Sequence, residues 1–328
     1  MHYLTLPGTV LAVSTMALGT AAFGTMVEES ASFGMLDAFA GAGGTLIDTA
    51  HVYADWHGGE RHRSEKTIGA WLKQRGRSDD VVIATKGGHP DLSTPLIPRL
   101  SPAEIVSDLE ESLRCLGVEH IDLYFLHRDD PSRPVAEIME VLDGQVRLGK
   151  IGTIGCSNWH AARIAEAQRM AKVGGLAPFV ASQAFWSLAT ANPGAFASDH
   201  VLIDEDAVRH YRDQNLPILA YTSQARGFFS KAAVAGAAHL KPDLRAAFDN
   251  PENRGRLDRA IILARELGVA VSAITLAYLT SREVACIPII GPMTITQLQD
   301  SLAAADLRLT VEMVRFLIGH ANLTGDQA

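Results

Sequence analysis

The chain has 328 residues, of which 47% are hydrophobic and 20% charged, a composition typical of a globular protein with a large core. The formal net charge of −8, with lysine and arginine scattered along the chain, argues against a protein that binds nucleic acid or a membrane surface. Three widely separated cysteines, Cys115, Cys156 and Cys286, are typical of a reducing compartment and not of a disulfide framework. We therefore expect a cytoplasmic protein.

The N-terminal region 4–24 is apolar, but it lacks a basic segment and is interrupted by Pro7 and several glycines. We interpret it as a β-hairpin followed by a first strand, and not as a signal peptide. No uninterrupted apolar run reaches the roughly 18 residues that a membrane-spanning helix requires.

Eight short runs rich in β-branched residues are predicted to be strands, and they are nearly continuous in hydrophobicity instead of alternating. This pattern is typical of a parallel sheet that is covered on both faces. The predicted strands span residues 14–18, 45–48, 81–85, 121–126, 151–155, 180–182, 218–221 and 286–289.

Amphipathic helices are predicted between these strands. Ser64 is expected to open one helix, and Ser101 to cap another that has a proline at its first position. Gly149 and Gly268 each follow a helical segment, where a left-handed residue is favoured. The eightfold alternation predicts a (β/α)8 barrel with an N-terminal hairpin. Residues 1–328 contain no linker-like or low-complexity segment, so we expect a single domain.

A doubly wound nucleotide-binding sheet is the alternative α/β architecture, and it requires G-x-G-x-x-G between the first strand and the first helix. The glycines within residues 41–44 precede a strand instead. We interpret them as the end of a helix and a turn, which disfavours this architecture.

Four polar residues lie at or after the ends of successive predicted strands: Asp48, Tyr53, Lys86 and His127. In a (β/α)8 barrel these strand ends converge on one mouth, so the four side chains are expected to meet. Tyr53 would protonate the alkoxide that forms when hydride reduces a carbonyl, and Lys86 would lower the pKa of the phenol toward neutrality. Asp48 would position Lys86, while His127 would orient the carbonyl oxygen and relay the proton. Loop capping, solvation and packing are the alternative roles of these residue types.

Two other kinds of site are disfavoured. His51, His57 and His62 lie close in sequence, but no pair at helical spacing and no nearby cysteine supports a metal site, so we expect none. The segment GCSNW at 155–159 lacks the final glycine of the G-x-S-x-G nucleophile motif, which argues against a serine hydrolase.

Seven segments occur in a recognisable order over nearly the whole chain: IDTAHVYADW, IATKGG, IDLYFLHRDD, GKIGTIGCSNW, SQAFWSL, LAYTSQARGFFS and IPIIGPMTITQLQDSL. Together they closely resemble the aldo-keto reductase family, and in particular bacterial and fungal members grouped with aryl-alcohol dehydrogenases. The resemblance implies a (β/α)8 barrel that binds NADPH or NADH without a Rossmann motif. It implies reduction of an aldehyde or ketone, or oxidation of the corresponding alcohol or sugar, and it places the family's catalytic tetrad on Asp48, Tyr53, Lys86 and His127.

The resemblance also implies cofactor contacts. Ser157, Asn158 and Gln183 match residues that bind the nicotinamide carboxamide, and Tyr221 matches the aromatic residue that stacks on the nicotinamide ring. A helix cap and core packing are the alternative roles. The full set of implied contacts is Thr20, Asp48, Ser157, Asn158, Gln183, Tyr221, Thr222, Ser223, Gln224, Arg226, Gly227, Gly291, Met293, Gln297 and Ser301.

One departure from the family pattern concerns the adenosine 2'-phosphate. Many relatives have arginine or lysine near the position of Met293. A further arginine of some relatives is replaced by Gln297 here, and their usual asparagine by Ser301. A phosphate without a cation loses charge-assisted hydrogen bonds. Selectivity for NADPH is therefore in doubt and use of NADH becomes credible, although Arg226 is a candidate to compensate.

Aromatic and polar residues near the expected mouth are candidates for substrate contacts, with packing as their alternative role. These candidates are Phe23, Tyr53, Trp56, Arg128, Trp159 and Trp186. The expected partner is a small-molecule carbonyl or alcohol, and neither the physiological substrate nor the oligomeric state follows from the sequence. Two other functions stay open: a nicotinamide-binding regulatory subunit that senses redox state with little turnover, and a lyase or isomerase that needs no nicotinamide.

Overall fold

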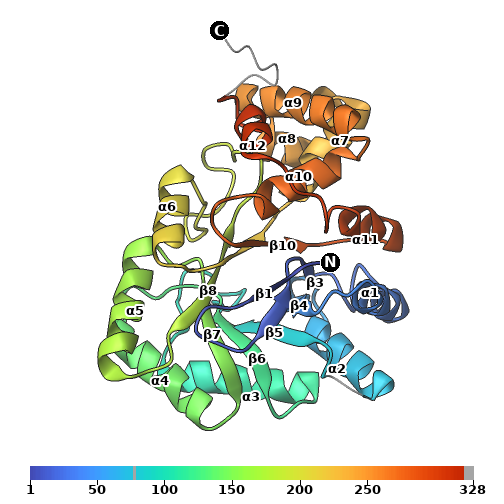
Figure 1. Cartoon of the computed structure of the whole chain (residues 1–328). Helices are drawn as coiled ribbons and strands as arrows, with labels where there is room; N and C mark the ends of the chain where they lie inside the picture. Colours follow the sequence, from blue (N-terminus) through green and yellow to red (C-terminus); the bar gives the residue numbers. More distant parts are fainter. Residues whose placement is uncertain (77–78, 321–328) are drawn as a thin grey trace.

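Eight parallel strands close into a barrel in the computed structural model, which describes residues 1–76 and 79–320. Each strand pairs with the next one along the chain, and the last pairs with the first (Figure 1). The predicted (β/α)8 barrel is therefore confirmed. Its strands are β3 (Ala17–Gly19), β4 (Leu46–Asp48), β5 (Val82–Gly87), β6 (Ile121–Leu126), β7 (Ile151–Ser157), β8 (Phe179–Phe185), β9 (Ile218–Tyr221) and β10 (Cys286–Ile290).

Helices surround the barrel on its outside (Figure 1). Within the described residues, no single helix is long and apolar enough to cross a membrane. Helices α9 and α10 reach that length and composition only as a pair, which is bent by 99°. The α-helices are α1 (Glu29–Gly41), α2 (Arg63–Arg75), α3 (Pro102–Leu116), α4 (Val135–Arg147), α5 (Ala161–Gly174), α6 (Glu205–Asp213), α7 (Phe228–Ala235), α8 (Pro242–Phe248), α9 (Pro251–Leu267), α10 (Val271–Thr280), α11 (Ile295–Leu302) and α12 (Val311–Leu317), and the short 3-10 helices are η1 (Asp55–His57), η2 (Ala225–Gly227) and η3 (Ala237–His239).

An antiparallel hairpin precedes the barrel, as predicted. Its strands are β1 (Tyr3–Thr5) and β2 (Ala12–Ser14). Leu6 and Val13 are buried in the apolar cluster that fills the barrel interior. Since that cluster also contains side chains from the barrel strands, the hairpin and the barrel share one core.

The predicted first strand, 14–18, is divided between two elements in the structure. Ser14 ends β2, and the barrel strand β3 begins only at Ala17. Ser14 Oγ donates a hydrogen bond to the carbonyl of Met16 (2.6 Å) and accepts one from the backbone N–H of Thr45 (3.0 Å). These bonds hold a bend between the hairpin and the barrel, which a run of apolar residues does not reveal.

Three barrel strands continue further toward the mouth than predicted. Strand β5 extends to Gly87, β7 to Ser157 and β8 to Phe185. Lys86 is in register with β6, and Ser157 is in register with Gln183. These three polar residues therefore lie within the hydrogen-bonded ladder and not in loops. The ladder holds their Cα atoms, and so the start of each side chain, in a fixed position.

Several predicted helix ends agree with the structure. Ser101 and Glu104 form a capping box at the start of α3, which satisfies two backbone N–H groups of the first turn. Gly149 and Gly268 follow α4 and α9 with left-handed φ angles of 75° and 66°. Residues 41–44 form the end of α1 and the turn into β4, as interpreted.

The helix predicted to open at Ser64 is present and begins one residue earlier, at Arg63, so that Ser64 lies inside its first turn. The hydroxyl of Ser64 is buried and donates to the carbonyl of Thr20 (2.8 Å), so it ties the helix to the loop after β3 instead of capping it.

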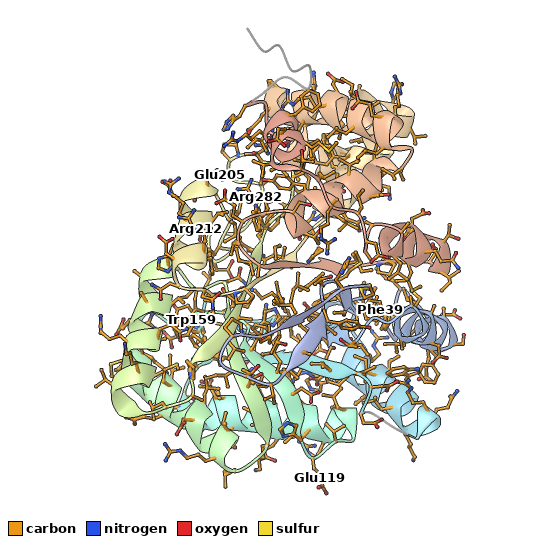
Figure 2. All side chains as sticks on the ribbon, viewed as in Figure 1. Phe39, Glu119, Trp159, Glu205, Arg212 and Arg282 are labelled. Atoms are coloured by element: carbon orange, nitrogen blue, oxygen red, sulfur yellow. The ribbon has the colours of Figure 1, made fainter. Side chains whose placement is uncertain are left out.

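Apolar side chains form two layers, one inside the barrel and one between the strands and the surrounding helices. Phe39 and Trp159 lie within the outer layer, whereas Glu119 and Arg212 are exposed (Figure 2). Burial of this kind is the main favourable contribution to folding, and it makes buried charged groups costly.

Glu65 of α2 is such a group, because its side chain has no exposed surface. Its Oε1 accepts a hydrogen bond from Thr85 Oγ1 (2.6 Å). Burial outweighs this bond and raises the pKa of Glu65 from 4.5 to about 7. The folded protein therefore binds the proton of the Glu65 carboxyl group more tightly than the unfolded chain does. Stability decreases as the pH rises from 4.5 to about 7 and stays reduced above that range.

We predict that Glu65→Gln raises the free energy of unfolding at pH 8 by about 1–3 kcal/mol, since one pKa unit corresponds to about 1.4 kcal/mol. Near pH 4.5 the difference should be small, because the folded wild type is already protonated there. Urea unfolding at both pH values measures the effect, with the exposed Glu119→Gln as control. An identical pH dependence in wild type and Glu65→Gln would contradict the prediction.

Candidate active site

Three of the four predicted catalytic residues meet directly at the C-terminal mouth of the barrel. Lys86 Nζ donates hydrogen bonds to Asp48 Oδ2 (2.8 Å), to Tyr53 Oη (2.9 Å) and to the carbonyl of Thr49 (2.6 Å). The ammonium has three protons and all three are directed to acceptors. Since Lys86 has no exposed surface, the charge is fixed in one place.

A fourth side chain completes this network from across the barrel. Gln183 of β8 donates through Nε2 to Asp48 Oδ1 (2.8 Å). Both carboxylate oxygens of Asp48 are therefore engaged, one by Lys86 and the other by Gln183. The arrangement joins strands β4, β5 and β8 and makes Asp48 a positioning group for the ammonium.

The protonation states of Lys86 and Tyr53 are set by their burial and by the charged groups that they contact. Burial lowers the pKa of Lys86, but Asp48 and Tyr53 outweigh it and hold that pKa above its ordinary value, so the group is an ammonium. The pKa of Tyr53 was expected to move toward neutrality, and this expectation is wrong for the structure. Burial raises the pKa of Tyr53 above its ordinary value, and the opposing attraction of Lys86 is smaller.

His127 directly follows β6, and its ring lies beside that of Tyr53. Its backbone N–H donates to the carbonyl of Gly87 (2.8 Å), and its ring is 5.9 Å from that of Tyr53 between centroids, at 76°. Burial, assisted by nearby His89 and Arg128, holds the pKa of His127 well below its ordinary value. The imidazole is therefore neutral and has a single N–H to offer a substrate oxygen.

The residues matched to the nicotinamide lie beside this network. Asn158 Oδ1 accepts from Tyr221 Oη (2.6 Å) and from the backbone N–H of Val201 (3.2 Å). Asn158 Nδ2 donates to Ser157 Oγ (3.1 Å). Ser157 and Asn158 do not cap a helix, because α5 begins only after His160.

A cavity of about 820 Å³ opens at the C-terminal ends of β9 and β10. Nine residues of the implied cofactor set line it: Thr222, Ser223, Gln224, Arg226, Gly227, Gly291, Met293, Gln297 and Ser301. Thr20 of the same set is fully buried elsewhere, where its hydroxyl donates to the carbonyl of Asp48 (2.9 Å) and contacts Ser64 Oγ (2.9 Å). Its hydroxyl therefore serves the protein's own network.

The loop after β9 has an unusual backbone. Thr222, Ala225 and Arg226 have left-handed φ angles of 54°, 48° and 55°, a conformation that is unfavourable for residues with a Cβ atom. Such strain persists where the surrounding structure enforces it, and it is concentrated at binding sites. Here Ser223 Oγ donates to the carbonyl of Ile289 (2.6 Å), which fixes the loop to β10 along the cavity.

A model of the family described as "Aldo/keto reductase family" matches residues 15–320. The chain belongs to the aldo/keto reductase family. Its members are carbonyl-reducing oxidoreductases, and we assign the chain to this class.

Curated relatives of this reductase extend over nearly its whole length. An uncharacterized oxidoreductase YrpG of Bacillus subtilis is 32% identical, over 97% of this chain and 95% of the relative. The aryl-alcohol dehydrogenase [NADP(+)] of Phanerodontia chrysosporium is 27% identical, over 96% of this chain and 84% of the relative. Norsolorinic acid reductase stcV of Emericella nidulans is 28% identical, over 95% of this chain and 79% of the relative.

Three aromatic residues expected to contact substrate in this reductase are buried in the core instead: Phe23, Trp159 and Trp186. The ring of Trp159 meets that of Phe179 edge-on at 5.3 Å between centroids, and its indole N–H donates to the carbonyl of Arg128 (3.2 Å). Phe23 and Trp159 have no exposed surface and Trp186 has 4%, so the expectation is corrected for these three residues.

Trp56 and Arg128 do lie at the mouth. Trp56 is 48% exposed, and its ring is 5.8 Å from that of Tyr53 between centroids. Arg128 donates through Nε to Asp199 Oδ2 (2.8 Å) and through a terminal nitrogen to the carbonyl of His127 (3.0 Å). Asp199 was not singled out in the sequence, because its long loop gives no sign of where it folds.

Sequence reasoning also missed residues that line the cavity. Lys231, Ser272 and Asp300 are among them. Lys231 Nζ donates to the carbonyl of Arg226 (2.8 Å). Lys231 is the fourth residue of α7, the helix that begins directly after Gly227. This closeness in sequence to the loop implied to bind the cofactor could have identified it.

Proposed function

We propose that this reductase transfers hydride between NADPH or NADH and an aldehyde or ketone, with Tyr53 as the proton donor in reduction. The observation that carries the proposal is the buried ammonium of Lys86, which is hydrogen-bonded to both Tyr53 Oη and Asp48 Oδ2. The bound cofactor would supply the hydride. The same groups would serve oxidation of the alcohol, with Tyr53 as the base.

The residues present fit a nicotinamide dinucleotide. The cavity of about 820 Å³ is within the size range of small-molecule and cofactor sites. At the mouth, Asn158 and Gln183 carry amide groups and Ser157 a hydroxyl group, which match the donor and acceptor atoms of a carboxamide. A bound carboxamide would take the place of bonds that Asn158 makes to Ser157 and Tyr221. The aromatic side chain of Tyr221 lies beside them.

Proton transfer follows from the charges of the network. A raised pKa keeps Tyr53 protonated near neutral pH, which is the form a proton donor needs. As the carbonyl oxygen gains charge, Tyr53 gives up its proton and Lys86 stabilises the phenolate at 2.9 Å. The neutral imidazole of His127 would orient the same oxygen by donating its N–H.

The substrate surface is small and mixed in polarity. Trp56 offers an exposed aromatic face next to Tyr53, and Arg128 offers a cation that Asp199 partly balances. We propose a small aromatic or hydroxylated carbonyl compound as the substrate class. The names of the relatives that act on aryl alcohols and on norsolorinic acid are consistent with an aromatic substrate.

Parallel titrations of the full chain with NADPH and with NADH, followed by tryptophan fluorescence, test the cofactor assignment. Consumption of the reduced cofactor with 4-nitrobenzaldehyde then tests turnover. Quenching together with turnover is expected. Quenching without turnover of any aldehyde tested would favour a redox-sensing subunit, and no response to either cofactor would overturn the proposal.

The preference between the cofactors is predicted to depend on Met293. This side chain is 37% exposed at the cavity, just before α11. The cavity-lining residues of α11, which are Gln297, Asp300 and Ser301, carry no positive charge. We expect Met293→Arg to tighten NADPH relative to NADH by about tenfold, since a charge-assisted hydrogen bond contributes about 1.5–3 kcal/mol. Met293→Gln, of similar length but uncharged, is the control. An unchanged ratio of affinities in Met293→Arg would place the 2'-phosphate elsewhere.

A further inference from the structure

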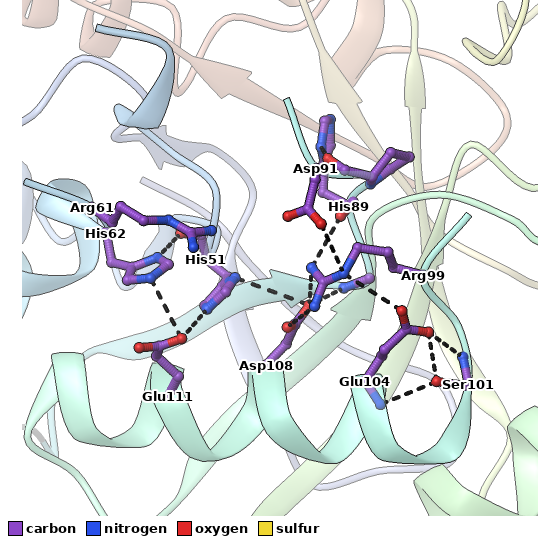
Figure 3. Close-up of polar contacts among 12 residues, drawn as sticks. His51, Arg61, His62, His89, Asp91, Arg99, Ser101, Glu104, Asp108 and Glu111 are labelled. Carbon is purple, nitrogen blue, oxygen red and sulfur yellow. Dashed lines mark hydrogen bonds and ion pairs between the residues drawn. The ribbon is translucent and has the colours of Figure 1, made fainter. Parts of the chain in front are cut away.

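A second group of polar side chains lies outside the proposed catalytic network. His51 and His62 stand near the two ends of the loop between β4 and α2, and both are buried. Glu111 reaches them from α3 (Figure 3). One ligand atom from each of the three residues lies within 4.8 Å of the other two. We call this group the His-Glu cluster.

Both imidazoles of the His-Glu cluster present the same ring nitrogen to the same carboxylate oxygen. His51 Nε2 is 3.1 Å from Glu111 Oε2, and His62 Nε2 is 3.5 Å from it. The two rings are stacked, with centroids 4.0 Å apart and an angle of 28° between their planes. Two nitrogens and one oxygen thus converge on one small volume.

The other nitrogen of His62 shows which atom carries its proton. His62 Nδ1 lies 2.6 Å from the carbonyl oxygen of His51. A carbonyl can only accept, so Nδ1 is the donor and Nε2 is the nitrogen that faces Glu111 Oε2. This nitrogen and this oxygen would repel each other without a proton or a metal ion between them.

This arrangement is the one that metal-binding histidines use. A histidine ligand usually donates its second ring N–H to a carbonyl or a carboxylate, which fixes the tautomer and the ring orientation. His62 does so to the carbonyl of His51. His51 Nδ1 is 4.0 Å from Asp108 Oδ2, which is an ion-pair distance and too long for a hydrogen bond.

The surrounding charges are also suited to a cation. Asp108 lies near His51 and is paired with Arg99 (Figure 3). Asp55 Oδ2 is 3.8 Å from His62 Nδ1 and is paired with Arg61. Glu111 has a longer ion pair, in which Oε1 is 3.8 Å from the exposed Arg114. Its Oε2 instead faces the two imidazole nitrogens. Oε2 is therefore the oxygen that is placed to bind an ion together with the two histidines.

We propose that the His-Glu cluster binds a Zn²⁺ ion through His51 Nε2, His62 Nε2 and a Glu111 carboxylate oxygen. Two imidazoles and one carboxylate are a known zinc ligand set, with the fourth position left for water. The side chain of Glu111 is 34% exposed, which provides a route for the ion and for that water. On binding, the ion takes the place of the proton that His51 Nε2 shares with Glu111, and the imidazole stays neutral with its one proton on Nδ1.

The location of the ion suggests what it does. Tyr53 lies on the loop between His51 and His62, and the backbone N–H of His51 donates to the carbonyl of Lys86 (2.9 Å). A Zn²⁺ ion would join both ends of this loop to α3 and hold the phenol in place without contacting it. Sequence spacing did not indicate a metal site, because Glu111 lies 60 residues beyond His51.

Isothermal titration of the full chain, first treated with EDTA and then dialysed, tests the proposal with ZnCl₂ as the probe. We expect one equivalent to bind and to raise Tm. Glu111→Gln should weaken binding by at least about tenfold, as losses at metal ligands and their supports do. His57→Ala is the matched control, because His57 belongs to the same loop but lies outside the cluster.

A second measurement does not depend on stability. Co²⁺ in place of Zn²⁺ should give visible absorption typical of a four-coordinate nitrogen and oxygen site, and His51→Gln should abolish it. Wild type that binds no Zn²⁺ would overturn the proposal and leave a protonated imidazole as the bridging cation. Equal Zn²⁺ affinity in wild type, Glu111→Gln and His51→Gln would show adventitious binding elsewhere and would also overturn it.

Discussion

Replacing Tyr53 by phenylalanine is expected to lower kcat for aldehyde reduction by about 10²–10⁴-fold, the usual contribution of a positioned general acid. The phenol oxygen is the atom of this group that would face the substrate, and it is 2.9 Å from the ammonium of Lys86. Phenylalanine keeps the ring, including its contact with the edge of Trp56. The loss would therefore report proton transfer and not a change in packing.

The measurement is steady-state consumption of the reduced cofactor, combined with cofactor titration of the same variant. Cofactor affinity should stay within a few-fold of wild type, because the cavity at β9 and β10 does not include Tyr53. Tyr3→Phe is the matched control, since Tyr3 is an exposed tyrosine of the N-terminal hairpin. Retention of wild-type kcat in Tyr53→Phe would exclude Tyr53 as the proton donor.

The convergence of the catalytic candidates could be predicted because strand ends of a (β/α)8 barrel share one mouth. Asp48 and His127 each stand at the end of a recognisable apolar run, and the structure brings them to the same rim. Lys86, Ser157 and Gln183 lay beyond the predicted strand ends. The ladder continues past the β-branched residues because neighbouring strands supply the partners.

The other features that differ between the sequence-based predictions and the structure depend on tertiary packing. A tryptophan in a loop motif can point into the mouth or into the core, and only the neighbouring helices decide, as they do for Trp159. The pKa of Tyr53 depends on how completely the phenol is removed from water, which no sequence motif specifies. The His-Glu cluster depends on a carboxylate from α3, a contact that local spacing rules do not detect.

Replacing Lys86 by methionine separates the catalytic and structural contributions of the network. Methionine has a similar length but leaves Asp48 Oδ2 and Tyr53 Oη without the ammonium that joins them. We expect kcat to fall by about 10²-fold or more, since the phenolate formed on proton transfer loses its counter-charge. Cofactor affinity, measured by fluorescence titration, should change little, and a collapse of binding would contradict the assignment of Lys86 to proton chemistry.

Stability should fall in the same variant, because Asp48 stays buried with Gln183 as its remaining polar contact in this network. Removing one partner of a buried ion pair costs about 3–5 kcal/mol in the free energy of unfolding. The double variant Asp48→Asn, Lys86→Met removes the uncompensated charge, so it should regain much of the stability that Lys86→Met loses. Its kcat should stay low, because Tyr53 still lacks the ammonium. Recovery of stability without recovery of activity would show that Lys86 acts on Tyr53 and not merely as a counter-ion that keeps the barrel mouth folded.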